Sequence, residues 1–535
     1  MRRSHVAIIA AVGAMLLTLP AIALGHAERH SYYPDGNVGK VPLNRNSGPS
    51  LVVCKNDSVK LIKRSWRGNA RMTRKMLRIQ KRCKFSDIQA AVDAAKNNYR
   101  ILVMPGLYKE EPSRAKPVDD PACKDLKEPY GSVPGGIGLP GETTMVPSYE
   151  YQRKCPNAQN LIAIVGDGPD DDRVCDDKCN IEIEGEGKRP NDVLIQGDKK
   201  KLNIIRADRA DGVVLENFTV EYSDFNNIYA IETNGFRFDH VISRFSREYG
   251  FLTFVSDHGI YKDLDASYSG DSGVYPGAGP EGHCQRYGIE IAGVNSHDNN
   301  LGYSGTAGNG VYAHDNKFHD NGTGIATDSF VPNHPGMPQD CAKWENNEIY
   351  SNNKDLFNAD MDHYCQVTPY AERDPRKVCS TFQNPVGTGL LIAGGDGDIA
   401  KGNYIYDNWR NGITLLWVPA TLRGDNDPSH QYDVSNDNSF TNNHMGLRPD
   451  GTRDPNGKDF YWDEEGKGNC WQDNQTAPGE SIKSDPATLP KCPGGPFSPG
   501  MPAKTAMQAS CATWDPMTNT DPPGCDWFTV PPEPK

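Results

Sequence analysis

Acidic, imidazole and basic side chains gather in one window of this sequence, between residues 250 and 286. Carboxylates can hold a divalent cation, histidine and tyrosine can exchange protons, and lysine or arginine can neutralise an anion. The window contains Asp257, His258, Tyr261, Lys262, Asp263, Asp265, Asp271, Tyr275, His283 and Arg286. These residue types are the ones that acid–base chemistry on an anionic substrate requires, so the window is the first candidate site.

Aspartate and histidine also stand next to each other six times. The pairs are Asp239-His240, Asp257-His258, His297-Asp298, His314-Asp315, His319-Asp320 and Asp362-His363. Neighbours on a strand point to opposite faces, so we expect the two members of a pair not to share a site. Outward members on stacked strands could still line one groove. The alternative is that they are ordinary turn and surface residues.

A repeat must position these residues. Four copies of Asn-x-Ile/Phe-x-x-Asn begin at Asn316, Asn347, Asn403 and Asn438. Upstream, Gly212, Gly235 and Gly259 each begin a short apolar run, and they are 23 and then 24 residues apart. A period in the low twenties with Asn and Gly at the corners is typical of a β-solenoid, in which each rung must stack on the next to bury its apolar face. Asn and Gly are expected to take the left-handed turn conformations.

The first regular elements follow residue 84. Ser86 and Gln89 have capping-box spacing, and Ile88 and Val92 share one face of the predicted helix. A buried strand is predicted over residues 101–104, before a Pro-Gly turn and Tyr108.

This opening, Phe85-Ser-Asp-Ile-Gln-Ala-Ala-Val-Asp-Ala-Ala95 followed by Ile101-Leu-Val-Met-Pro-Gly-Leu-Tyr108, resembles the start of the pectin-lyase-like superfamily. The resemblance covers residues 85–450 and is close to uncharacterised exported bacterial proteins of that superfamily. It implies an all-β, right-handed parallel β-helix with an N-terminal capping helix. The superfamily includes lyases, hydrolases, epimerases and non-enzymes, so the resemblance does not select an activity.

The resemblance implies a polysaccharide substrate, and the residue types alone suggest roles for the window. Eliminating a uronate requires a cation to neutralise the carboxylate, a base for the C5 proton and an acid for the leaving oxygen. Lys262 or Arg286 could neutralise, and His258 or Tyr261 could act as the base. Asp257, Asp263 and Asp271 could hold Ca²⁺. Fragments around Asp257-His258 resemble pectate lyase, polygalacturonase and alginate epimerase motifs, but no catalytic set is present whole.

Two further segments are expected to be loops. The run from Gly270 to Gly277 breaks the rung pattern, and loops on a rigid scaffold carry function. The second segment is an acidic stretch that could hold Ca²⁺ or form a solvated turn. It contains Asp167, Asp170, Asp171, Asp172, Asp176 and Asp177.

Four regions are predicted along the chain. Residues 1–27 have a positive start, an apolar run and a small-residue end, as in a secretory signal; the alternative is an uncleaved anchor. Residues 28–84 form a basic segment, residues 85–450 the β-helix, and residues 451–535 an irregular extension rich in Pro and Cys. Fourteen cysteines without any C-x-x-C favour disulfides in a secreted or cell-surface protein.

Charge is distributed unevenly. The chain carries a net charge of −13, yet residues 58–86 contain eleven Lys or Arg and no acid. The acidic remainder does not suit nucleic acid, and it repels anionic polysaccharide unless cations bridge the two. The basic segment could contact cell-envelope polymer; the alternatives are a solvated arm or an N-terminal cap. No segment after the signal is apolar enough to span a bilayer.

The sequence therefore predicts an exported β-helix protein that acts on polysaccharide by lyase, epimerase or hydrolase chemistry, with a site on an exposed face near residues 257–328. The competing hypothesis is a non-catalytic surface or binding protein that uses the solenoid as a rigid display.

Overall fold

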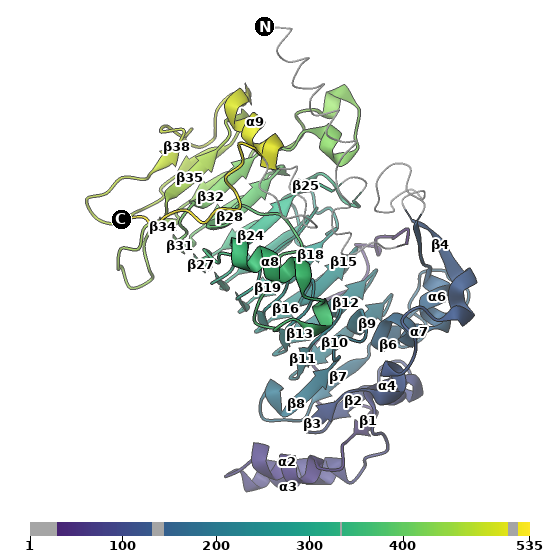
Figure 1. Ribbon diagram of the computed structural model, residues 1–535. Helices are drawn as coiled ribbons and strands as arrows, with labels where there is room; N and C mark the ends of the chain where they lie inside the picture. Colours follow the sequence, from purple (N-terminus) through teal and green to yellow (C-terminus); the bar gives the residue numbers. More distant parts are fainter. Residues whose placement is uncertain (1–28, 131–143, 332–333, 512–522) are drawn as a thin grey trace.

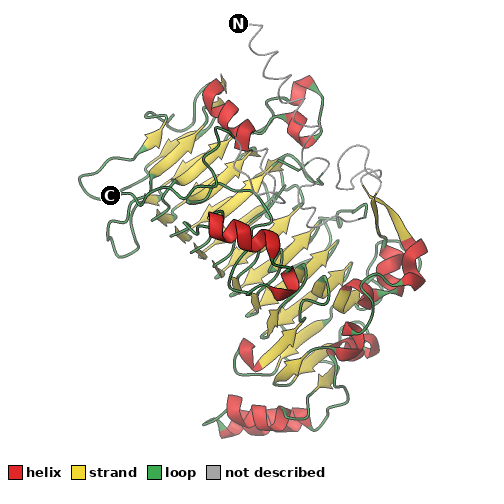
Figure 2. Cartoon of the chain, viewed as in Figure 1, coloured by secondary structure: helices red, strands yellow, loops and turns green. Residues whose placement is uncertain are grey.

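The structure is a computed structural model that describes residues 29–130, 144–331, 334–511 and 523–535. Its body is a solenoid of three long parallel sheets, which Figure 1 shows from end to end and Figure 2 shows as stacked arrows. From residue 100 to residue 462, each turn of the chain adds one strand to each sheet in order. The predicted all-β, right-handed parallel β-helix is confirmed.

Sheet 1 has twelve strands. They are β1 (Ser50–Val53), β2 (Arg100–Val103), β7 (Glu182–Gly185), β10 (Val213–Glu216), β13 (Asn234–Asp239), β16 (Asp257–Lys262), β19 (Ile289–Ala292), β22 (Val311–His314), β26 (Lys343–Glu345), β30 (Ile399–Lys401), β33 (Ser439–Thr441) and β37 (Cys470–Gln472).

Sheet 2 has ten strands. They are β3 (Gly106–Tyr108), β8 (Val193–Gln196), β11 (Thr219–Glu221), β14 (Ile242–Arg244), β17 (Asp265–Ser267), β20 (Asn295–His297), β23 (Lys317–His319), β27 (Glu348–Tyr350), β31 (Tyr404–Tyr406) and β34 (His444–Met445).

Sheet 3 has eleven strands. They are β6 (Asn160–Val165), β9 (Asn203–Asp208), β12 (Asn226–Ile231), β15 (Phe251–Phe254), β18 (Ser272–Gly277), β21 (Leu301–Tyr303), β24 (Thr323–Asp328), β28 (Thr388–Ala393), β32 (Asn411–Leu416), β35 (Lys458–Trp462) and β38 (Ser484–Asp485). Parallel strands thus extend on both sides of residues 85–450.

The segment from Gly270 to Gly277, predicted as a loop, is mostly strand β18. Val274 points into the core, and the glycines are needed for close packing rather than for a loop. A Cβ on Gly273 would lie 2.1 Å from the Ser296 Oγ, and one on Gly277 would lie 1.8 Å from the Tyr275 ring. The loop begins only after this strand.

The repeated asparagines form buried ladders, and they do not supply the left-handed turns that the sequence predicted for them. At the corner between sheets 1 and 2, the amide of Asn316 donates to Asn347 (2.9 Å), Asn347 to Asn403 (3.0 Å), and Asn403 to Asn443 (2.9 Å). The residue before each one takes the left-handed conformation, for example Asp315 with φ 54° and Asn346 with φ 55°. Stacked amides satisfy one another inside the corner.

The N-terminal end of the solenoid is closed by helices. Helix α4 (Ile88–Ala94) forms as predicted, but its cap is not the predicted capping box. The buried carboxylate of Glu110 accepts hydrogen bonds from the backbone N–H groups of Ile88 (2.8 Å) and Gln89 (2.9 Å) instead. Helices α2 (Ser58–Ser65) and α3 (Ala70–Gln80) form a hairpin at the same end of the molecule (Figure 1).

Seven disulfides pair all fourteen cysteines, as the sequence predicted. Most of them fasten appendages, such as the loop closed by Cys175–Cys179 and the C-terminal helix α9 (Pro502–Cys511), held by Cys511–Cys525. Other insertions carry the hairpin β4 (Lys127–Tyr130) and β5 (Thr144–Pro147), and helices α5 (Glu111–Arg114), α6 (Tyr149–Lys154), α7 (Pro156–Gln159) and α8 (Ala359–Val367). No helix in the described part of the chain is long and apolar enough to cross a membrane. The predicted signal lies outside the described residues.

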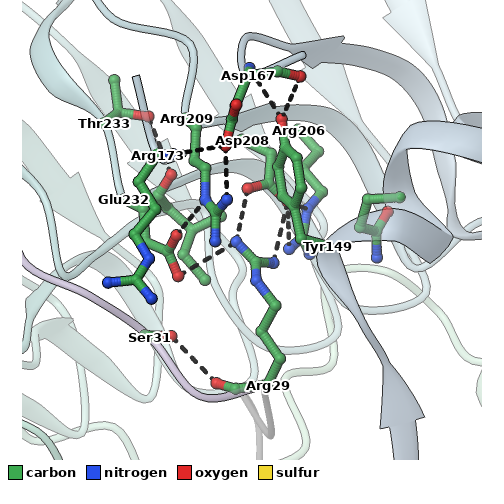
Figure 3. A network of polar contacts seen from close by, with 12 residues as sticks. Arg29, Ser31, Tyr149, Asp167, Arg173, Arg206, Asp208, Arg209, Glu232 and Thr233 are labelled. Carbon is green, nitrogen blue, oxygen red and sulfur yellow. Dashed lines mark hydrogen bonds and ion pairs between the residues drawn. The ribbon is translucent and has the colours of Figure 1, made fainter. Parts of the chain in front are cut away.

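Residues 29–49, which we call the N-terminal strap, bind across several rungs before β1. Its Arg29 guanidinium contacts the buried carboxylates of Asp208 (2.8 Å) and Glu232 (3.2 Å). Figure 3 shows this anchor, in which Arg206 and Arg209 supply further positive charge to the same carboxylates. Buried acids and bases therefore neutralise one another where the strap begins.

Candidate functional site

A row of ionisable side chains stands on the outer face of sheet 1. Strand register places Glu184, Glu216, Asp239 and Lys262 side by side on β7, β10, β13 and β16. They point outward because the residue before each one is packed in the core: Ile183, Leu215, Phe238 and Tyr261. Successive rungs thus bring three carboxylates and one ammonium group into a line.

The corner after this row adds His240 and Asp263. Both have left-handed backbone conformations, with φ 52° and 50°, and they occupy the same position on consecutive rungs. The His240 Nδ1 is hydrogen-bonded to Asp239, and its Nε2 lies 3.8 Å from the Asp263 carboxylate. An imidazole held through Nδ1 keeps Nε2 available for proton exchange.

Four Asp–His neighbours are hydrogen-bonded to each other, so the expectation that such neighbours do not meet is wrong. They are Asp239-His240, His297-Asp298, His314-Asp315 and His319-Asp320. In each pair the second residue has a φ between 52° and 59°. The strand has already ended at that residue, and the left-handed turn brings its side chain back to its neighbour.

Two neighbouring carboxyl groups of the row have pKa values shifted in opposite directions. Burial raises the pKa of Glu216 to about 7, and the charges of Glu184 and Asp239 add to this rise. Burial would also raise the pKa of Asp239, but hydrogen bonds from His240 and Arg237 lower it overall. Near neutral pH, Glu216 can therefore hold a proton beside an ionised Asp239. That is the arrangement in which one group serves as an acid while the other stays charged.

Two groups of side chains could hold a metal ion in the described part of the chain. Asp239, His240 and Asp263 offer ligand atoms within 4.8 Å of one another on the sheet 1 face. Asp167, Asp170 and Asp172 do so in the acidic loop. Ca²⁺ prefers oxygen ligands, so the all-carboxylate group matches its chemistry better; a histidine suits a transition metal. However, Arg209 already contacts the Asp167 carboxylate at 2.7 Å.

Of the seven predicted site residues, the structure brings only Lys262 and Asp263 to this face. Tyr261 is fully buried in the core, where its hydroxyl is 2.8 Å from the Thr253 hydroxyl. Burial raises the pKa of Tyr261 far above its usual value. A side chain in this position does not reach a polymer outside the solenoid.

Three more predicted residues lie together where sheet 3 leads into sheet 1. The Arg286 guanidinium binds both oxygens of the buried Asp257 carboxylate, at 2.9 and 2.7 Å. The His258 Nδ1 lies 2.9 Å from the Asn234 amide oxygen. The strap packs on this group, because a Cβ on Gly36 would lie 2.5 Å from an Arg286 nitrogen. Arg286 is thus committed to an ion pair.

Asp271 lies on a different face, outside sheet 3, and is completely buried. Burial raises its pKa well above the usual range, and the charge of Glu248 raises it further. Burial also raises the pKa of Glu248 to about 7 and that of Asp328 to about 6. These acids form a buried group of their own, which does not join Lys262.

Sequence reasoning did not select Glu216 or His240. The rung period could have found them, because Glu216, Asp239 and Lys262 are each 23 residues apart, as are His240 and Asp263. A search for ionisable residues at the spacing of Gly212 and Gly235 would have aligned the row. Closeness in sequence to residue 257 was a weaker indication of a shared site than the rung period.

The fold defines a class of protein: the chain is a right-handed parallel β-helix. No family model matches the chain, and no curated protein matches it in sequence.

Solved structures with similarity to the chain include three β-helix proteins. The pectate lyase Pel9A has 12% identity and a TM-score of 0.35, over 92% of this chain and 91% of that one. The A-module of the Azotobacter vinelandii mannuronan C-5 epimerase AlgE4 has 12% identity and a TM-score of 0.36, over 75% and 93%. The enzymatically active domain of bacteriophage CBA120 tailspike protein 2 has 10% and 0.36, over 54% and 40%. At these values the likeness concerns the fold alone.

Proposed function

We propose that the protein is an exported, carbohydrate-active β-helix protein that acts on an anionic polysaccharide at the outer face of sheet 1. The observation that carries the proposal is the register of Glu216, Asp239 and Lys262, with His240 and Asp263 at the adjoining corner. An acid, a carboxylate-held imidazole and an ammonium group on adjacent rungs match the needs of proton transfer next to a uronate carboxylate.

The roles follow from charge and hydrogen bonding. Lys262 neutralises the substrate carboxylate and so makes the C5 proton more acidic. His240 takes that proton at Nε2, with Nδ1 held by Asp239. Protonated Glu216 gives its proton to the glycosidic oxygen as the C4–O bond breaks and a C4–C5 double bond forms. Elimination thus moves one proton onto His240 and one from Glu216, without any other reactant.

Calcium is part of the proposal as a bridging cation. Among the described residues, the acidic loop and the Asp239–His240–Asp263 group are the two places that offer donors for a cation. A bound divalent cation would offset the repulsion between an acidic protein and an acidic polymer. Asp170→Asn and Asp263→Asn, each tested with calcium and with chelator, would assign a calcium effect to one place or the other.

The test is a turnover assay with polygalacturonate, alginate and neutral polysaccharides. Unsaturated uronate ends are followed by ultraviolet absorbance, and reducing ends are measured in parallel. We expect absorbance to rise with the wild type and to fall at least 100-fold with Lys262→Met or His240→Ala. Lys401→Met is the matched control, because Lys401 stands on the same outward row four rungs further on and is expected to be neutral.

A non-catalytic display protein is the second candidate function. It is favoured by the dispersal of the other predicted residues, since Tyr261, Asp257 and Asp271 are buried and Arg286 is paired. Polysaccharide binding without new ends of either kind would support it. Reducing ends without absorbance would instead indicate hydrolysis, with Glu216 and Asp239 as the carboxyl pair.

A further inference from the structure

The strongest concentration of unpaired charge lies on the α2–α3 hairpin. All eleven Lys and Arg residues between positions 60 and 84 are exposed. They are Lys60, Lys63, Arg64, Arg67, Arg71, Arg74, Lys75, Arg78, Lys81, Arg82 and Lys84. None of the eleven has an ion-pair partner in the described part of the chain, although acidic residues are frequent elsewhere.

The hairpin is folded, so the basic segment is not a solvated arm, which was one of the alternatives for it. Ile62 and Met76 are buried against Val52, Leu102 and Met104, on the outer side of the first sheet 1 strands. The Cys54–Cys83 disulfide closes the base of the hairpin. Two hydrogen bonds fasten it to the next rung, from the Ser65 hydroxyl to Asp192 (2.7 Å) and from the Trp66 indole to the Glu186 carbonyl (3.4 Å). The cations are thus held on a rigid base.

This arrangement of charge opposes helix stability. Two pairs of like charges lie four residues apart on α3, Arg71 with Lys75 and Arg74 with Arg78, and such pairs repel on a helix surface. Arg71 also lies in the first turn of α3, where positive charge is unfavourable beside the N-terminal end of the helix dipole, and no acid balances it. The positive charges destabilise α3, and the disulfide holds the hairpin in place despite them. Such a surface is suited to a partner that supplies the missing negative charge.

The hairpin adjoins the candidate site. It covers the outer face of sheet 1 at the strands immediately before Glu184. Burial and the charge of Glu184 raise the pKa of Glu186 to about 7, and the nearby charges of Lys75 and Arg82 act in the opposite direction. A linear polymer bound along the hairpin would therefore lead toward the row of Glu216, Asp239 and Lys262, where Asn44 of the strap donates a hydrogen bond to Asp239 (3.1 Å).

We propose that the α2–α3 hairpin is a dedicated binding surface for a carboxylated polysaccharide, which it leads toward the outer face of sheet 1. The proposal rests on the proposed function for its choice of polymer. Seven disulfides favour an oxidising compartment outside the cytosol, where nucleic acid is not the usual partner. The only aromatic side chain of the hairpin, Trp66, is partly buried against its apolar cluster at the turn between the helices, so the hairpin offers no exposed row of aromatic rings on which bases could stack.

The test compares two charge-matched triple variants of the full protein. The first, Arg71→Glu/Arg74→Glu/Arg78→Glu, changes three exposed positions of α3. The second, Lys200→Glu/Lys483→Glu/Lys491→Glu, makes the same change of net charge at exposed lysines elsewhere. Binding to immobilised polygalacturonate is measured over a range of salt concentrations, and circular dichroism checks folding.

We expect the hairpin variant to bind polygalacturonate at least 10-fold more weakly, with a slope of log K against log salt that is shallower by about 2. The control variant should keep its affinity within about twofold. Equal loss in both variants, or no loss in the first, would overturn the proposal. Tighter binding of duplex DNA than of polygalacturonate, lost in the same variant, would overturn the choice of partner.

Failure here is separable from failure of the proposed function. Lys401→Met is expected to bind polygalacturonate as well as the wild type does, because Lys401 lies outside both the hairpin and the proposed site. If the hairpin variant loses binding but no preparation yields product, the proposed reaction is wrong and the binding surface stands. If the wild type turns over polymer and the hairpin variant binds normally, the proposed reaction stands and the proposed binding surface is wrong.

Discussion

Individual carboxyl groups on this scaffold differ chiefly in their burial. Glu248 is 4% exposed and accepts a hydrogen bond from the Thr381 hydroxyl at 2.7 Å, and no cation among the described residues forms an ion pair with it. Burial raises its pKa to about 7. Glu216, in a partly open row, reaches a similar pKa through burial and neighbouring negative charges. The first carboxyl group is sealed inside, whereas the second can meet a substrate.

Replacing Glu248 should change the pH dependence of stability. A carboxyl group whose pKa is raised in the folded state binds more protons there, so its contribution to stability is full at acid pH and is lost as pH rises toward 7. The rise from 4.5 to about 7 corresponds to about 3 kcal/mol lost between pH 4.5 and pH 7. Glu248→Gln should remove this loss, as measured by urea unfolding at pH 5 and pH 8.

The exposed Glu372→Gln serves as the control and should follow the wild type. If the difference in unfolding free energy between Glu248→Gln and the wild type is the same at both pH values, Glu248 does not change its protonation in this range.

At the scale of elements, the corners of the solenoid are held by amide ladders. Asn347 donates to Asn403 and to the Ala313 carbonyl, both at 3.0 Å, and accepts from Asn316. Each rung therefore depends on the next for hydrogen bonds that water cannot replace at a buried corner. These hydrogen bonds between rungs explain the spacing of the Asn-x-Ile/Phe-x-x-Asn motif better than turn conformation does.

Asn347→Ala should destabilise the protein by about 3 kcal/mol, because it removes the acceptor of the buried Asn316 backbone N–H and side-chain amide and the donor to the Ala313 carbonyl. Equilibrium urea unfolding measures the loss. The exposed Asn426→Ala is the control and is expected to change stability by less than about 0.5 kcal/mol. A loss below 1 kcal/mol at Asn347 would mean that water enters the corner and satisfies the ladder.

At the scale of the whole molecule, the protein is a one-dimensional stack with covered ends. A rung contacts mainly its neighbours, so disturbances at one end need not reach the other. The strap is fastened to the stack by the Arg29–Asp208 ion pair, the α2–α3 hairpin by the Cys54–Cys83 disulfide, and helix α9 by the ion pair between Lys504 and Asp485 of β38. Their local stability can therefore differ from that of the rungs.

Removal of the Cys54–Cys83 bond should loosen one end only. For a separation of 29 residues, chain entropy assigns the bond about 3 kcal/mol. In Cys54→Ser/Cys83→Ser, trypsin should cut within residues 60–84 at least 10-fold faster, while fragments from the central rungs stay intact by mass spectrometry. Cys511→Ser/Cys525→Ser is the matched control at the other end and should leave hairpin cleavage unchanged. General fragmentation in the first variant would show that the solenoid unfolds as one unit.

The sequence by itself determined the solenoid, the number of disulfide-forming cysteines and the capping helix. Periodic apolar positions and corner residues such as Asn316 can be recognised in the sequence by their spacing. In the fold, these residues contact the next rung. It also located the basic segment and marked Lys262 and Asp263, because residue type is visible in the sequence.

Only the tertiary structure decided which ionisable groups meet. Lys262 and its neighbour Tyr261 differ by one position, yet the strand alternation sends one outward and the other into the core. Glu216 joins Lys262 because strand register stacks positions 23 residues apart, whereas Asp271 is nearer in sequence but lies on another sheet. The strap packs on the ion pair of Arg286 and Asp257, although Gly36 of the strap lies more than 200 residues before them in the chain. Burial and charge pairing depend on such long-range packing, and no local pattern encodes them.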